Sequence, residues 1–170
     1  MEYKIMSMAG FKVIGFEKEF TLDNADNEIP MFWDEMFQKY AKNVLEGNAP
    51  ANPQEKAIVE NGIGEFGICI DDANTGKLRY LIAGKYSNEE IPEGMSVFEF
   101  PEGDWAIFDC IGAMPDALQL LSDRIFKEWL PGNPDYEING NANVEWYDST
   151  NGDKTDPNYH SAVWIPVKKK

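Results

Sequence analysis

The chain has few basic side chains and few side chains that bind metals. In 170 residues it has 15 Lys and Arg against 30 Asp and Glu, with one histidine and two cysteines. Binding to a phosphate backbone requires clustered Lys and Arg, so a net charge of −15 argues against direct nucleic-acid binding. The negative charge either maintains solubility or favours cationic ligands, and charge alone does not separate these two interpretations.

Long apolar runs and targeting signals are also absent. The first residues show no basic start followed by an apolar stretch, and no run approaches the roughly 20 apolar residues that cross a bilayer. Cys69 and Cys110 lie inside apolar, strand-like runs without a Cys-x-x-Cys partner. We therefore expect reduced, buried thiols in a cytoplasmic protein that has no membrane partner, no metal site and no cofactor.

The common catalytic fingerprints are missing. The sequence has no Gly-x-Ser-x-Gly, no Walker glycine loop and no dinucleotide-binding fingerprint. His160 stands in a loop with no serine in a nucleophile setting nearby. A binding protein is therefore favoured over an enzyme.

The sequence does contain a repeat, because the same order of predicted strands and helices occurs twice. Alternating and apolar runs predict strands, and helical spacing predicts two long helices. We expect an α+β fold with a duplicated strand-helix-strand-strand unit, pseudo-twofold symmetry, an antiparallel sheet, two main helices and a central ligand cleft. The chain is expected to form one domain, 1–170, with one repeat over about 1–86 and the other over about 95–170. The predicted elements are a strand at 11–17, a helix at 30–45, strands at 66–71 and 78–84, a strand at 105–112, a helix at 116–130, and strands at 143–148 and 161–167.

The details of these elements give further expectations. Pro30 fits the first turn of the first helix, and apolar residues at 33, 36, 37, 40 and 44 predict its buried side. A short helix is expected near 54–59. The run 95–100 alternates and is expected to pair with the strand through Trp105.

Glu145 is the strongest candidate for a functional residue. It lies in the strand-like run Val144-Glu145-Trp146-Tyr147, where alternation places Glu145 and Tyr147 on one face. Burying a carboxylate among aromatic rings is costly without a partner. Glu145 therefore faces solvent, accepts an internal hydrogen bond, or faces a ligand, and these three alternatives stay open.

Aromatic side chains on both halves are candidates for the wall of a ligand site. Such rings serve either a core or a pocket, and buried Tyr and Trp need a polar partner, which a cleft supplies. The candidates are Trp33, Phe37, Tyr40, Tyr80, Trp105, Phe108 and Trp164.

Four motifs in this order resemble the GyrI-like small-molecule-binding family, the effector-binding domain of some AraC-type and MerR-type regulators. They are Phe11-Lys12-Val13-Ile14-Gly15, the run from Pro101 to Phe108, Val144-Glu145-Trp146-Tyr147-Asp148, and Val163-Trp164-Ile165-Pro166-Val167.

The resemblance implies a cleft lined by aromatic rings, with Glu145 in the position of a glutamate that recognises lipophilic cations. Many relatives have an acidic residue where this chain has Ala162, which leaves room for a neutral aromatic ligand as well. We expect a stand-alone domain that binds a hydrophobic, aromatic or cationic small molecule and senses or sequesters toxic compounds.

The resemblance also carries two alternatives. Some stand-alone relatives are similar to hydrolases that open reactive cyclopropane-containing compounds, and there Glu145 and Tyr147, or Tyr40, would be catalytic. A third alternative is a protein-interaction role, such as the modulation of gyrase.

Overall fold

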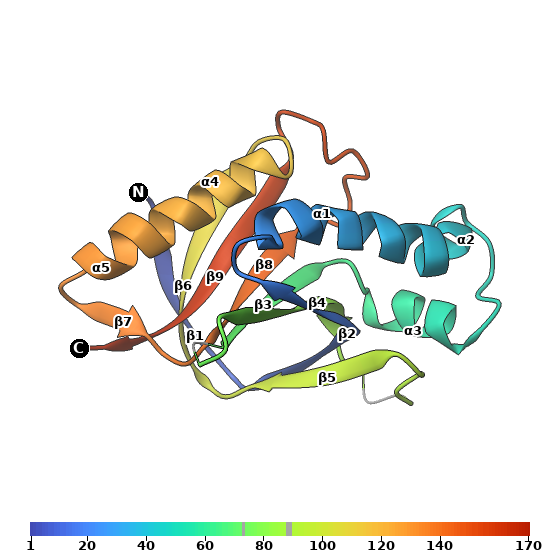
Figure 1. Cartoon of the computed structure of the whole chain (residues 1–170), viewed down its shortest axis with the longest axis horizontal. Helices are drawn as coiled ribbons and strands as arrows, with labels where there is room; N and C mark the ends of the chain where they lie inside the picture. Colours follow the sequence, from blue (N-terminus) through green and yellow to red (C-terminus); the bar gives the residue numbers. More distant parts are fainter. Residues whose placement is uncertain (73, 88–89) are drawn as a thin grey trace. The chain divides into compact units, whose positions relative to one another are not determined.

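The computed structural model describes residues 1–72, 74–87 and 90–170. Contacts divide the chain into two compact units. Figure 1 shows the helices and strands, coloured along the sequence. Unit 1 contains Met1–Gly10 and Pro101–Lys170, and unit 2 contains Phe11–Phe100.

Unit 2 is a four-stranded antiparallel sheet with helices on one face. Its strands lie in the order β3, β4, β2, β5. The elements are β2 (Phe11–Thr21), α1 (Ala25–Met36), the π-helical segment η1 (Phe37–Ala41), α2 (Lys42–Leu45), α3 (Pro53–Asn61), β3 (Phe66–Asp72), β4 (Lys77–Lys85) and β5 (Met95–Phe100).

The register of unit 2 fixes which side chains face the helices. Phe16 pairs with Ile82, and Lys18 pairs with Tyr80. Residues paired directly across antiparallel strands share a face, so these side chains and their alternate neighbours lie on one side. The buried cluster on this side includes Phe16, Tyr80 and Ile82 together with Phe32 and Met36 of α1.

The first helix differs from its predicted form in two ways. It begins at Ala25, so Pro30 lies inside the helix and not in its first turn. Asp26 and Glu28 occupy the first turn, where they favour the helix dipole. The segment from Phe37 to Ala41 is π-helical, and within it Ala41 is buried whereas Phe37, which was expected on the buried side, is 37% exposed.

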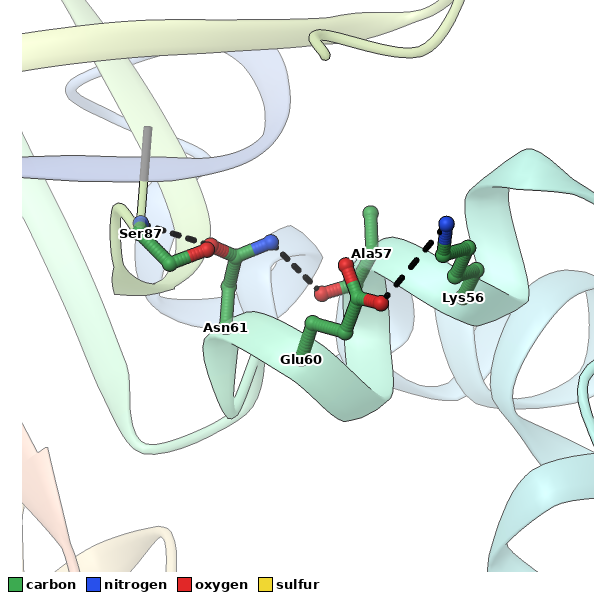
Figure 2. Close-up of polar contacts among 5 residues, drawn as sticks. All are labelled: Lys56, Ala57, Glu60, Asn61 and Ser87. Carbon is green, nitrogen blue, oxygen red and sulfur yellow. Dashed lines mark hydrogen bonds and ion pairs between the residues drawn. The ribbon is translucent and has the colours of Figure 1, made fainter. Parts of the chain in front are cut away.

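The end of α3 is bonded to the segment that follows β4, as Figure 2 shows. The buried Asn61 side chain donates to the Ala57 carbonyl at 2.9 Å and accepts from the Ser87 N–H and hydroxyl at 2.9 and 2.8 Å. A Cβ on Gly84 would lie 2.0 Å from the Asn61 carbonyl oxygen. Glycine is therefore required where this helix approaches the strand. The short helix expected near 54–59 is confirmed as α3.

Unit 1 repeats the arrangement with other residues. Its strands lie in the order β1, β6, β9, β8, and β7 also pairs with β9. The elements are β1 (Lys4–Met8), β6 (Gly103–Ile111), α4 (Asp116–Arg124), the π-helical segment η2 (Ile125–Trp129), α5 (Leu130–Gly132), β7 (Tyr136–Ile138), β8 (Ala142–Tyr147) and β9 (His160–Lys169).

The helix of unit 1 packs on the face of the sheet that carries Phe108. The rings of Phe108 and Trp129 meet edge to face, with 4.9 Å between centroids. Leu118 and Ile125, on the same helix, are also buried. Leu118, Leu121, Ile125 and Trp129 follow helical spacing and are buried or half-buried, whereas Leu120, which was expected to broaden this side, is 66% exposed.

The predicted α+β class and the repeated strand-helix-strand-strand order are confirmed, but one pairing was wrong. β5 pairs with β2, whereas β6 pairs with β1 and β9. The run 95–100 therefore does not form a hairpin with the strand through Trp105. The sequence prediction also missed β1, and the compact units differ from the expected halves 1–86 and 95–170 because β1 and β5 each join the other half.

Candidate functional site

Glu145 lies on the helix-bearing face of the unit 1 sheet. It pairs across the strands with Val163, and Val163 pairs with Phe108, so the three side chains share a face. Phe108 contacts Trp129 on this face. Glu145 is half-buried, so its carboxylate has lost part of its water without leaving the surface.

Tyr147 holds the Glu145 carboxylate. Its hydroxyl donates a hydrogen bond to Glu145 Oε1 at 3.1 Å, which confirms that alternation brings the two side chains to one face. The Lys154 ammonium lies over the Tyr147 ring, 5.0 Å from the centroid. Glu145 is therefore a positioned negative charge, whereas the buried Tyr147 ring already has the Lys154 cation over it.

Trp105 and Trp164 lie on the opposite face of the same sheet. Trp164 pairs with Ile107 and Val144, and Trp105 pairs with Pro166, so both tryptophans are out of phase with Glu145. Trp105 is 1% exposed and Trp164 is half-buried. The register thus separates these two candidates from the carboxylate.

Phe108 shares the face of Glu145 but belongs to a packed aromatic cluster. It is 0% exposed, and its ring lies 5.6 Å from that of Tyr3 and 4.9 Å from that of Trp129. Within unit 1, Phe108 supports the helix, whereas Glu145 and Tyr147 supply the polar chemistry.

In unit 2, Trp33 and Tyr80 are joined by a hydrogen bond. Trp33 Nε1 donates to the Tyr80 hydroxyl at 2.9 Å, which connects α1 to β4. Tyr80 is fully buried, Trp33 is half-buried, and Phe37 one turn later is exposed. The hydrogen bond satisfies the polar atoms of both rings and leaves the Trp33 ring at the boundary of the core.

Tyr40 lies apart from this pair, beside a polar hollow of about 290 Å³. Its ring stacks on Phe16 with 4.4 Å between centroids. The hollow is also lined by Glu55, which is 5% exposed and accepts from Asn43 at 2.6 Å and from Asn52 at 3.0 Å. Both carboxylate oxygens of Glu55 are bonded within the protein, so Glu55 serves to hold the start of α3.

Asp71 lies two residues beyond Cys69 on β3. Cys69 pairs with Tyr80 and Asp71 pairs with Leu78, so both face the helices of unit 2. Partial burial raises the pKa of the Asp71 carboxyl above its usual value. Asp71 and Asp72 are both exposed, as expected for solvated charge.

Other polar groups serve the fold of unit 1. Burial raises the pKa of the Cys110 thiol, which keeps it in its unreactive protonated form. The Tyr159 hydroxyl donates to the Asp148 carbonyl at 3.2 Å, and burial raises its pKa as well. Among the described residues, no three His, Cys, Asp or Glu side chains gather as metal ligands would, and no helix is long and apolar enough to cross a bilayer.

Solved structures show the same fold. The structure of SAV2435 bound to tetraphenylphosphonium aligns with a TM-score of 0.78 and 23% identity over 99% of this chain and 94% of that chain. A bacterial transcription regulation protein from Staphylococcus aureus MU50 aligns with a TM-score of 0.72 and 23% identity over 99% of both chains. An integron cassette protein of Vibrio cholerae aligns with a TM-score of 0.67 and 14% identity over 98% of this chain and 95% of that chain.

These similarities define the class of protein as a GyrI-like domain. The model of the family Cass2, the integron-associated effector binding protein, matches residues 4–167. The chain therefore belongs to the integron-associated effector binding protein family and is a small-molecule-binding domain. No curated protein matches it.

Proposed function

We propose that the chain binds hydrophobic aromatic cations and functions in sensing or sequestering toxic compounds of this kind. The observation that carries the proposal is the half-buried Glu145 carboxylate, held by the Tyr147 hydroxyl at 3.1 Å on the helix-bearing face of unit 1. The positioned carboxylate attracts a cationic ligand by its charge.

Two further observations support this ligand class. The net charge of −15 raises the concentration of cations near the surface. The similar protein SAV2435 has been solved with tetraphenylphosphonium, a bulky cation in which aromatic rings surround the charge.

The test is calorimetric titration of the purified protein with tetraphenylphosphonium and with planar cationic dyes. Glu145→Gln keeps the shape of the side chain and removes its charge. We expect the variant to bind the cation more weakly by about 1–3 kcal/mol, because a charged contact is lost.

Glu137→Gln is the matched control in the same unit, since Glu137 forms an exposed ion pair with Lys168 at 3.7 Å. Equal affinities of the wild type and Glu145→Gln would remove Glu145 from the proposal.

The hydrolase alternative has the same hydrogen-bonded pair in its favour, since a carboxylate and a phenol side by side can move a proton. Mass analysis of electrophilic aromatic compounds after incubation with the protein separates the two functions. Intact compound with a raised melting temperature indicates binding. Repeated formation of a water adduct indicates hydrolysis.

A further inference from the structure

The loop that joins β8 to β9 brings a lysine to the site of Glu145. This loop is formed by residues 148–159, and Lys154 lies near its middle. The Lys154 ammonium lies 5.0 Å from the centroid of the Tyr147 ring, and the Tyr147 hydroxyl donates to Glu145 Oε1 at 3.1 Å. One tyrosine therefore contacts a cation with its ring and a carboxylate with its hydroxyl.

Hydrogen bonds around Lys154 fix the backbone of this loop. The Lys154 carbonyl accepts from the Met114 N–H at 2.8 Å, just before α4 begins. On the two sides of Lys154, Asp153 Oδ1 accepts from the N–H and the hydroxyl of Thr155 at 3.0 and 2.5 Å. None of these bonds involves the Lys154 side chain, so a change of that side chain leaves them in place.

The position of Lys154 places it in competition with a cationic ligand. Tyr147 is 6% exposed, so little of its ring is open to a second group. An aromatic ring attracts a cation through the negative charge of its face, and Lys154 already uses this attraction. A ligand cation that approaches the same ring and the Glu145 carboxylate meets the positive charge of Lys154.

The Lys154 side chain can leave this position without a change in the loop backbone. The residue is exposed, and a cation–π contact at an exposed site is weak. The ammonium is carried on a flexible four-carbon stem, so it can move into water while the hydrogen bonds of the loop remain.

We propose that Lys154 is an internal cation beside Glu145 and Tyr147 that a cationic ligand must displace. The proposal rests on the proposed function, since it assumes that the ligands are cations recognised by Glu145. Lys154 lowers the affinity for every cation that uses this ring and this carboxylate. Ligands whose aromatic groups make additional contacts overcome that loss, so Lys154 acts as a specificity-determining residue that disfavours small cations.

The experiment measures how the affinity for tetraphenylphosphonium changes when the charge of Lys154 is removed. The cation is titrated by calorimetry into the wild type, Lys154→Gln and Glu145→Gln. We expect Lys154→Gln to bind about two- to fivefold more tightly than the wild type, because the ligand no longer displaces a cation from the Tyr147 ring.

Lys168→Gln is the matched control, since it removes the same charge from the same unit. Lys168 forms an exposed ion pair with Glu137 at 3.7 Å. It lies seven residues along β9 from Ser161, the residue that pairs with Tyr147, and this is about 23 Å in a strand. Its affinity should equal that of the wild type, and melting curves establish that all the variants are folded.

Tetraphenylborate, which has the same shape and the opposite charge, separates competition from a gain of space. Lys154→Gln should not bind this anion more tightly than the wild type does, because Lys154 does not compete with an anion. An equal gain for both ions would show that the shorter side chain makes room for the ligand, and would overturn the role of Lys154.

The remaining outcomes separate the two proposals. If neither the wild type nor Lys154→Gln binds the cation, or if Glu145→Gln binds it as tightly as the wild type, the proposed function is overturned and the role of Lys154 with it. If Glu145→Gln binds more weakly but Lys154→Gln shows no gain, the role of Lys154 alone is overturned. An equal gain in Lys168→Gln shows a general effect of net charge and also overturns it.

Discussion

The hydrogen bond from Trp33 to Tyr80 joins α1 to the sheet inside unit 2. Either Trp33→Phe or Tyr80→Phe removes it, and the Tyr80 hydroxyl is fully buried. We expect the unfolding free energies of the two single variants and the double variant to be non-additive, with a coupling of about 1 kcal/mol. Urea unfolding of the four proteins measures this, and strictly additive losses would contradict it.

Residue by residue, strand alternation predicted orientation within a strand but not between strands. It placed Glu145 and Tyr147 together, and their hydrogen bond confirms this. It could not place Trp105 and Trp164 relative to Glu145, because that depends on the register of β9 against β6 and β8.

At the scale of elements, apolar runs predicted most of the strands. The sequence pattern did not predict which side of the first helix is buried along its whole length, and it did not predict the short strand β1. Each main helix contains a π-helical segment, η1 and η2, and the extra residue per turn is invisible to a 3.6-residue pattern. β1 was missed because its exposure pattern shows little alternation, with Ile5 and Met8 half-buried and the rest exposed. The short connection at 101–104 favoured a hairpin between β5 and β6. In the structure β6 instead pairs with β1 on one side and with β9 on the other.

The contact between α3 and β4 gives a prediction for Gly84. Gly84→Ala places a Cβ 2.0 Å from the Asn61 carbonyl oxygen, and Asn61 is held by Ser87, so backbone must move. We expect a loss of stability of about 1–3 kcal/mol or more. Gly132→Ala is the control, since nothing lies within 4 Å of its added Cβ. Similar melting temperatures of the two variants would contradict this prediction, because they would show that the backbone accommodates the added Cβ at little cost.

At the scale of the whole molecule, charge repulsion should dominate the response to salt. The 30 acidic residues can pair with at most 15 Lys and Arg, so unpaired negative charges remain whatever the local geometry. We expect the melting temperature to rise as NaCl increases from roughly 20 to 300 mM, because screening weakens repulsion between carboxylates. A melting temperature that falls over this range would mean that favourable ion pairs outweigh the excess charge.

The position of β1 has a consequence for how the chain is made. Lys4 pairs with Ile107, so β1 belongs to a sheet whose other strands are synthesised after the whole of unit 2. Unit 2 is a continuous stretch and can fold during synthesis, whereas β1 must wait, unpaired, until unit 2 and β6 have been synthesised. The mixed sequence of β1, with Lys4 and Ser7 between its apolar residues, suits a strand that stays exposed to other chains for so long.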